Sequence, residues 1–306
     1  MAVAVIINPI SGTARRVDAR KRAELAAAAV ARHGDAAEVF ITERVGHARE
    51  LAKAAAKRRA RLVLVWGGDG TINEAVAALA FGDVPIGVIP AGSGNGLATE
   101  LGIDRRPEEA IAIALRSEPR LIDVGEVGGR LFVNTAGIGF DAYVAAQFND
   151  PTNPRRGLLG YARITGRALF TYEAQEYRLV AVDSVDGTAG SRVAKRAVLV
   201  TIANGAQYGN NARIAPNARF DDGLLDLVVV EEASRVRTLM HVPRLFNGTA
   251  EQAPGCTIER IRRATIEADR PMTFHVDGEP VLGGTRLDVR VHPGALWIAA
   301  PPYTRT

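Results

Sequence analysis

One stretch decides the fold of the amino-terminal half: Leu62-Val63-Leu64-Val65-Trp66-Gly67-Gly68-Asp69-Gly70-Thr71-Ile72-Asn73-Glu74. Its first five residues are continuously apolar, as in a strand covered on both faces of a parallel sheet. Three glycines follow, and residues 71–81 then carry apolar side chains at the helical period. A strand, a glycine-rich loop and a helix in this order are typical of α/β folds that bind ligands at the carboxyl ends of their strands.

The same alternation of short β-branched runs and Ala-rich stretches extends over residues 3–115 and predicts a parallel-sheet α/β domain. We expect strands at 3–7, 37–41, 62–65 and 86–89. We expect helices at 18–32, 46–59 and 71–81. The whole stretch therefore predicts a doubly covered sheet.

After about residue 121 the pattern changes to shorter strands separated by Gly, Asp and Asn turns. This spacing predicts a mostly antiparallel sandwich or barrel. The expected strands are 131–134, 177–182, 197–203, 225–230, 265–268 and 287–291. We place the domain boundary near Ile122, which gives domains 1–122 and 123–306, with the last strand able to return to the first domain.

Composition limits the classes of protein to consider. The 306 residues are 47% hydrophobic and 24% charged, which is an ordinary globular composition. Cys256 is the single thiol, so an internal disulfide and a cysteine zinc cluster are excluded, and a reducing, cytoplasmic location is expected. The apolar run 2–7 stops at Asn8-Pro9 and is interpreted as a first strand rather than a signal peptide.

The charge balance favours an anionic partner. The formal net charge is +4 and the isoelectric point is about 9.4, which suits a nucleotide, a nucleic acid or a lipid surface. Aromatic residues make up only 6% and no recognised nucleic-acid-binding motif occurs, so we expect no nucleic-acid partner.

The loop 67–71 carries the most informative residue, Asp69. Glycines let the backbone approach an anion, and amides at a helix amino terminus point toward it. A carboxylate inside such a loop repels phosphates unless it binds a cation or accepts a proton, so Asp69 indicates Mg²⁺ or an attacking hydroxyl. The alternative is a plain strand-to-helix turn in which Asp69 caps the helix.

Two further loops follow strands of the first half, at 8–12 and 90–98. The loop 8–12 is interpreted either as a source of phosphate donors or as a plain turn, and the loop 90–98 repeats the glycine-rich design of 67–71, which suggests a crevice shared between those two loops. Neither has the P-loop spacing or a complete dinucleotide-binding motif. Ala91 breaks the hydrolase pattern Gly-x-Ser-x-Gly around Ser93.

In the second half, the segments 221–226 and 275–279 each contain Asp-Gly and are first interpreted as turns between strands. The functional alternative assigns the first segment to a divalent cation bound by oxygen ligands. It assigns the second to general base catalysis, with Asp277 and Glu279 on one side of an extended segment.

Taken in order, these motifs resemble the diacylglycerol kinase catalytic-domain family, which includes bacterial lipid kinases and sphingosine kinases. The resemblance rests on Asn8-Pro9-Ile10-Ser11-Gly12, Gly67-Gly68-Asp69-Gly70-Thr71, Asn73-Glu74, Pro90-Ala91-Gly92-Ser93-Gly94-Asn95-Gly96-Leu97-Ala98, Phe140-Asp141, Asp222-Gly223-Leu224 and Asp277-Gly278-Glu279. It implies an ATP-dependent lipid kinase with an α/β domain similar to that of NAD kinases and phosphofructokinases. A β-sandwich follows, and the active site lies in the cleft between the two domains.

The resemblance also implies roles for individual residues. Asp69 would serve Mg²⁺ or the lipid hydroxyl, Glu279 would accept the hydroxyl proton, and Asp277 is a further candidate base. A structural Mg²⁺ would bind Asp222 and the backbone carbonyls of Arg219 and Leu224, and Asp123 would connect this metal to the active site. The residues implied to line the ATP site are Asn8, Ser11, Gly12, Thr42, Gly67, Gly68, Asp69, Gly70, Thr71, Asn73 and Ser93.

One position departs from many bacterial diacylglycerol kinases. Those proteins have Asn-Asp where this chain has Asn95-Gly96, and their Asp is functional. The loop of this chain is closer to the version in sphingosine kinases.

The expected partners are a lipid substrate and the anionic inner face of a membrane, with a homodimer left open. Residues 154–172 are interpreted as a cover over the lipid entrance or an ordinary surface helix. Arg155, Arg156, Arg163 and Arg167 would contact the anionic leaflet. Arg22 and its basic neighbours are interpreted as a solvated helix face.

The alternatives to a lipid kinase are an NAD kinase-like enzyme with a soluble acceptor and a non-catalytic nucleotide- or membrane-binding module.

Overall fold

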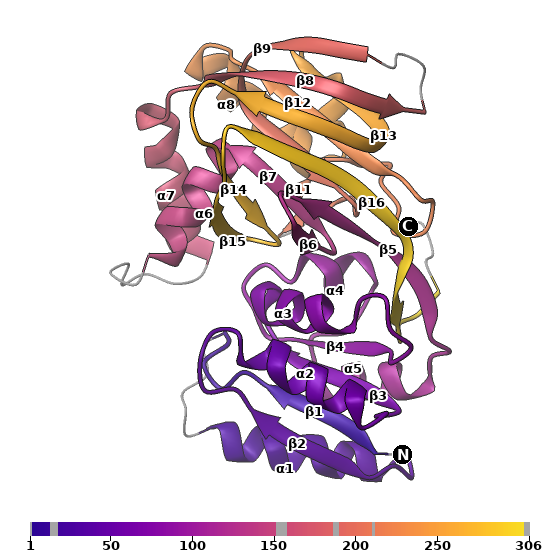
Figure 1. The fold of residues 1–306 in the computed structure, drawn as a ribbon. Helices are drawn as coiled ribbons and strands as arrows, with labels where there is room; N and C mark the ends of the chain where they lie inside the picture. Colours follow the sequence, from indigo (N-terminus) through magenta and orange to yellow (C-terminus); the bar gives the residue numbers. More distant parts are fainter. Residues whose placement is uncertain (1, 13–17, 151–157, 186–189, 210–211, 303–306) are drawn as a thin grey trace. The chain divides into compact units, whose positions relative to one another are not determined.

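The computed structural model describes residues 2–12, 18–150, 158–185, 190–209 and 212–302 (Figure 1). The chain forms two compact units. The first consists of Met1–Ile122 and Gly294–Thr306, and the second of Asp123–Pro293. The predicted contacts of Arg155 and Arg156 lie outside the described residues.

The first unit is built on a parallel sheet in the order β2-β1-β3-β4. Every residue of β1, β3 and β4 is buried, which explains their continuously apolar sequences. The strands are β1 (Val3–Ile7), β2 (Ala37–Ile41), β3 (Leu62–Gly67) and β4 (Ile86–Pro90). The end of a late strand, β16 (Arg286–Ile298), adds to this sheet, because Ile298 pairs in parallel with Ile86 of β4.

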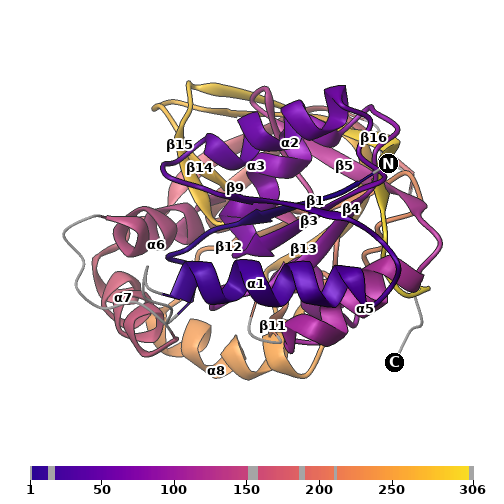
Figure 2. The same ribbon diagram turned by 90° about the horizontal axis from the view of Figure 1, so that it is seen from below.

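Helices cover both faces of this sheet. Figure 2 shows α2 (His47–Lys57) and α3 (Asp69–Leu79) on one face and α1 (Asp18–Ala31) and α5 (Pro107–Arg116) on the other. A short helix, α4 (Gly96–Glu100), follows β4. Within the described ranges, no helix is long and apolar enough to cross a membrane.

The second unit is mostly antiparallel. Its strands follow the order β15-β14-β7-β9-β12-β13-β16, and β8 pairs with both β9 and β13. The strands are β5 (Arg120–Val127), β6 (Arg130–Phe132), β7 (Thr135–Gly139), β8 (Gln175–Ser184), β9 (Gly190–Ala203), β10 (Gln207–Gly209), β11 (Ala212–Arg213), β12 (Leu225–Glu231), β13 (Cys256–Ala268), β14 (Thr273–Val276) and β15 (Glu279–Leu282). Long strands that pair on both edges enclose an apolar core that includes Phe132, Tyr177 and Phe274.

In its described residues this unit has three α-helices and one 3₁₀ helix: α6 (Phe140–Asn149), α7 (Leu158–Thr171), α8 (Arg235–Phe246) and Ala250–Gln252. α6 and α7 pack side by side, and α6 also contacts β7, β14 and β15. The predicted surface helix within 154–172 corresponds to α7 over its described part.

The strands predicted for the first half are confirmed within a residue or two. In the second half, β13 and β16 extend well beyond the predicted 265–268 and 287–291. The unassigned part of β13, residues 256–264, mixes exposed charged side chains with apolar ones. The unassigned part of β16, residues 292–298, contains Pro293 and Gly294 ahead of a mostly buried apolar run. β14 was missed because it is only four residues long and adjoins the Asp277-Gly278 turn.

The core of the second unit gives a stability prediction. Phe132 is fully buried, whereas Phe246 is 56% exposed. We expect Phe132→Ala to lower the free energy of unfolding by about 3–5 kcal/mol, because it removes buried apolar area and leaves a cavity. Phe246→Ala is the matched control and should change it by about 0.5 kcal/mol or less. Urea unfolding of both variants measures the difference, and equal effects would contradict this account of the core.

Candidate active site

Three loops meet at the carboxyl ends of the parallel strands in the first unit. The loop after β1 reaches the loop after β3 through Asn8, whose Nδ2 donates to Thr71 Oγ1 at 2.8 Å. The loop after β3 reaches the loop after β4, because the Ala91 amide donates to the Gly67 carbonyl at 2.9 Å. Gly12 lies against the Ala91 carbonyl, where a Cβ atom would be only 2.5 Å from the oxygen.

Asp69 holds the second and third loops together. Its Oδ2 accepts the Asn95 amide at 2.9 Å, and its Oδ1 accepts the Gly96 amide at 3.0 Å. Its own helix, α3, has Gly68 as amino-terminal cap and no side-chain capping bond. The alternative in which Asp69 caps its own helix is therefore excluded: the carboxylate instead accepts amides at the start of α4.

Asn95 gives the third loop its shape. Its backbone is left-handed, with φ of 51°, and its side chain exchanges two hydrogen bonds of 2.7 Å with the Gly92 backbone. The following residue, Gly96, is used through its amide. The Gly96 amide donates to Asp69 Oδ1 at 3.0 Å.

Arg22 is a site residue that the sequence interpretation missed. Its Nη1 donates to the Asn8 carbonyl at 3.2 Å and to Ser11 Oγ at 3.1 Å, and its Nη2 donates to the Ser11 carbonyl at 3.2 Å. The guanidinium also lies 5.3 Å from the centre of the Trp66 ring. The interpretation of Arg22 as a solvated helix face is wrong, because its guanidinium fixes the first loop. Arg22 and Ser11 are 11 positions apart, and no sequence motif predicts a contact between them.

Glu74 binds the backbone of the segment that follows β2. Its carboxylate accepts the amides of Gly46 at 2.7 Å and Ala48 at 3.1 Å, at the amino terminus of α2. A negative charge there is favoured by the helix dipole and by the unpaired amides of the first turn. Thr42, at the end of β2, is buried, and its amide donates to the Ile7 carbonyl at 2.9 Å.

The remaining predicted nucleotide residues belong to the same set of loops. Gly68 faces Gly92 so closely that a Cβ on Gly68 would lie 3.2 Å from the Gly92 Cα. Ser93 is exposed at the tip of the third loop. Gly67 ends β3, and Gly70, Thr71 and Asn73 lie in the first turns of α3.

In the second unit, Asp277 and Gly278 form the two-residue turn between β14 and β15. Both have positive φ, 48° and 85°, which is the requirement of a type I′ hairpin turn. The Asp277 carboxylate accepts the amides of Val133, Asn134 and Thr135 at 2.9–3.1 Å. Asp277 and Glu279 therefore do not lie on one side of an extended segment: Asp277 is buried in the turn and Glu279 is exposed at the start of β15.

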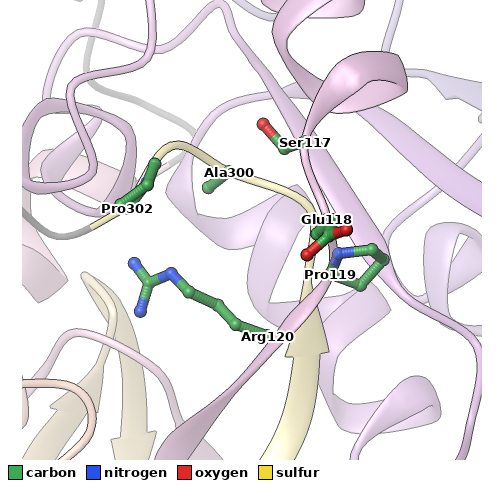
Figure 3. Close-up of a pocket in the computed structure, with 6 residues that line it drawn as sticks. All are labelled: Ser117, Glu118, Pro119, Arg120, Ala300 and Pro302. Carbon is green, nitrogen blue, oxygen red and sulfur yellow. The ribbon is translucent and has the colours of Figure 1, made fainter.

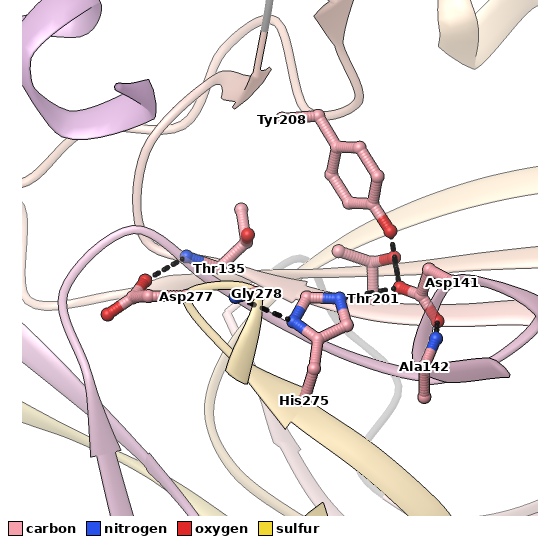
Figure 4. A network of polar contacts seen from close by, with 8 residues as sticks. All are labelled: Thr135, Asp141, Ala142, Thr201, Tyr208, His275, Asp277 and Gly278. Carbon is pink, nitrogen blue, oxygen red and sulfur yellow. Dashed lines mark hydrogen bonds and ion pairs between the residues drawn. The ribbon is translucent and has the colours of Figure 1, made fainter. Parts of the chain in front are cut away.

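A buried polar network lies beside this turn (Figure 4). His275 Nε2 is 3.1 Å from Asp141 Oδ2, and His275 Nδ1 accepts the Gly278 amide at 3.3 Å. The same Asp141 oxygen accepts the Tyr208 hydroxyl, and it lies 3.5 Å from Thr201 Oγ1. Asp141 and His275 are 4% and 5% exposed. The sequence motifs pointed to Asp141 but not to these partners.

The predicted metal residues form one local structure in the second unit. Asp123 Oδ2 accepts the Gly223 amide at 2.7 Å, and Asp222 Oδ1 accepts the Leu224 amide at 3.1 Å. Desolvation raises the pKa of the Asp222 carboxyl, against the lowering effect of the Leu224 amide, and a bound cation would offset that cost. Among the residues that the structure describes, no group of three or more His, Cys, Asp or Glu side chains could hold a metal. A divalent ion here would thus need the carbonyls of Arg219 and Leu224, as oxygen ligands of the kind that Mg²⁺ accepts.

A cavity of about 280 Å³ in the first unit contains none of the predicted site residues (Figure 3). It is lined by Ser117, Glu118, Pro119, Arg120, Ala300 and Pro302. The candidate site is therefore defined by the loops and their hydrogen bonds rather than by this cavity.

Two family models match the chain. The diacylglycerol kinase catalytic domain matches residues 2–127, and the YegS C-terminal NAD kinase beta sandwich-like domain matches residues 134–300. The chain is 31% identical over 270 residues to the "Probable lipid kinase YegS-like" of Chromohalobacter salexigens, covering 86% of this chain and 83% of the relative. It is 30% identical over 314 residues to the "Diacylglycerol kinase" of Mycobacterium tuberculosis, covering 98% and 96%.

A crystal structure of a diacylglycerol kinase from Bacillus anthracis has the same fold, with a TM-score of 0.72, 20% identity and coverage of 98% of this chain and 97% of that one. The two matched domains define a two-domain kinase with a parallel-sheet catalytic domain and a β-sandwich. The chain belongs to the family of diacylglycerol kinases and YegS-like lipid kinases. The predicted fold class and family are confirmed, and membership makes the protein an ATP-dependent lipid kinase.

The hydrogen bonds of Asp69 give a prediction. Asp69→Asn replaces one carboxylate oxygen with an amide that cannot accept, so one of the two amides of Asn95 and Gly96 loses its partner. A hydrogen bond to a charged group contributes about 1.5–3 kcal/mol, so exchange of these amides with deuterium should accelerate at least ~10-fold. Asp83→Asn, at an exposed position, is the control and should leave their exchange unchanged. Unaltered exchange in Asp69→Asn would contradict the bridging role of Asp69.

Proposed function

We propose that the protein transfers the γ-phosphoryl group of ATP to the hydroxyl of a membrane lipid such as a diacylglycerol or a sphingoid base. The observation that carries this proposal is the mutual bracing of three loops at one end of the parallel sheet, by Asn8, Asp69 and the Gly67–Ala91 contact. Loops at the carboxyl ends of such strands supply amide donors for phosphates.

ATP is held by the first unit. Ser11 and Gly12 from the first loop, residues 67–71 from the second and Ser93 from the third supply small side chains and backbone amides. Thr42 and Asn73 complete the set. Arg22 adds a positive charge beside Ser11 while holding that loop in place.

Glu279 is the best supported general base. Asp277 is buried, and its carboxylate oxygens are already engaged by the amides of three residues. Asp69 is likewise engaged with two amides. Glu279 is exposed at the start of β15, where its carboxylate can meet a lipid hydroxyl and take its proton.

Mg²⁺ is the metal we propose for this chemistry, since it neutralises charge on the phosphates as the phosphoryl group is transferred. Asp69 is the residue of the first unit that would hold a catalytic ion. Asp222, with the carbonyls of Arg219 and Leu224, would hold a structural ion, and Asp123 supports that turn through the Gly223 amide.

The experiment is transfer of radiolabelled γ-phosphate from ATP and Mg²⁺ to detergent-dispersed diacylglycerol, monoacylglycerol, sphingosine, ceramide and phosphatidylglycerol, with NAD as the soluble acceptor. Label on a lipid supports the proposal and names the acceptor. Label on NAD alone supports the soluble-substrate alternative, and ATP binding without any transfer supports the non-catalytic module.

The base assignment is tested in the same assay. Glu279→Gln should lower kcat by about 10²–10⁴-fold, the usual contribution of a positioned general base, with little change in KM for ATP. Glu173→Gln, at an exposed position of the second unit, is the matched control and should keep wild-type turnover. Full activity of Glu279→Gln would remove Glu279 from the mechanism.

We also propose contact between α7 and an anionic membrane. Arg163 and Arg167 are exposed and one helical turn apart, and Phe170 beside them is 59% exposed. Basic groups at an anionic surface contribute about 1 kcal/mol each, so replacing both arginines with Ala should weaken binding to phosphatidylglycerol vesicles ~30-fold. Arg49 and Lys53, an exposed pair with the same spacing on α2, provide the control double variant. Equal binding by the two double variants in vesicle sedimentation would contradict a role for α7.

A further inference from the structure

We propose that His275 is a positioning residue that holds the Gly278 amide, next to Glu279, in the tautomer that the buried carboxylate of Asp141 selects. This inference rests on the proposed role of Glu279 as base. His275 lies on β14, Gly278 ends the type I′ turn, and Glu279 begins β15. The histidine is thus within the hairpin that presents the base.

The hydrogen bonds assign the tautomer of His275. A backbone N–H only donates, so Nδ1, which accepts the Gly278 amide, carries no proton. The proton of the neutral ring is then on Nε2, which donates to Asp141 Oδ2 at 3.1 Å. Asp141 therefore selects the tautomer that leaves Nδ1 able to hold the amide next to Glu279.

Asp141 is a fixed anchor for this arrangement. Besides His275, its carboxylate accepts the Tyr208 hydroxyl through Oδ2 and the Ala142 amide at 2.7 Å through Oδ1. Gly137, which pairs with His275 across β7 and β14, provides the space, because a Cβ there would overlap the Asp141 carboxylate. The anchor comes from α6 and β10, outside the hairpin itself.

The turn is held on both of its sides. Asp277 binds the amides of residues 133–135, and its own amide donates to the Thr135 carbonyl at 2.8 Å. His275 holds the Gly278 amide from the other side. Glu279 is exposed at the start of β15 and directly follows the Gly278 amide that His275 holds. Displacement of a reacting group by about 1 Å can lower the reaction rate ~100-fold. Loss of the contacts that hold this turn should therefore lower kcat.

Two substitutions separate the two nitrogens of His275. In His275→Asn the side-chain oxygen lies near the position of Nδ1 and can still accept the Gly278 amide. In His275→Gln the side chain reaches the position of Nε2 and can still donate to Asp141, but it leaves the Gly278 amide without that acceptor. We expect His275→Asn to keep kcat within about 3-fold and His275→Gln to lose about 10–100-fold, with KM for ATP unchanged in both.

The tautomer has a readout that is independent of turnover. In protein labelled with ¹⁵N-histidine, the His275 signal, assigned by its loss in His275→Asn, should show the proton on Nε2. Asp141→Asn presents an amide to Nε2 and should shift the proton to Nδ1 and lower kcat with His275 still present. Thermal unfolding confirms that each variant is folded.

The outcomes distinguish the two levels of the proposal. Equal turnover of His275→Gln and His275→Asn, or a wild-type proton on Nδ1, overturns the positioning role while wild-type transfer to lipid still supports the proposed function. A wild-type protein that labels no lipid overturns the proposed function, and with it the role of His275. Selective loss in His275→Gln with an Nε2 proton supports both.

Discussion

The loops of this protein depend on one kind of interaction, a carboxylate that accepts the backbone amides of a neighbouring turn. Asp69 does this for the third loop, Glu74 for the start of α2, and Asp277 for residues 133–135. Hydrogen bonds to an ionised acceptor are roughly twice as strong as neutral ones, so each carboxylate stabilises a turn whose amides would otherwise need water. Acidic side chains thus have a structural role at the same places where a kinase needs acids for catalysis.

That double use makes carboxylates difficult to interpret individually. A carboxylate that accepts several amides has its oxygens engaged within the protein, as for Asp277. Glu279, two residues later, is exposed at the start of β15. The hairpin turn thus buries one of these two neighbouring carboxylates and exposes the other.

Much of the first unit could be predicted from the sequence, because β1, β3 and β4 are buried on both faces and each is followed by a loop that contains glycine. The Asp-Gly pair at 277–278 likewise predicted a turn. The contacts of Arg22 with Ser11 and of His275 with Asp141 could not be predicted, since they join residues 11 and 134 positions apart. Only the folded backbone decides which of several basic or polar residues reaches a given partner. Fold and family are supported independently by the matched domains, whereas the roles of site residues remain proposals.

The path of β16 has a consequence for how the chain is made. Its first half pairs with β13 in the second unit, and its last residues complete the first unit, where Ile298 pairs with Ile86 and the Ala295 carbonyl accepts the Phe81 amide. Domains usually fold as they leave the ribosome, amino-terminal part first. Here the first unit, although translated first, stays with an open edge at β4 until residues 294–298 emerge. Premature termination anywhere in the second unit would therefore leave the first one unfinished as well.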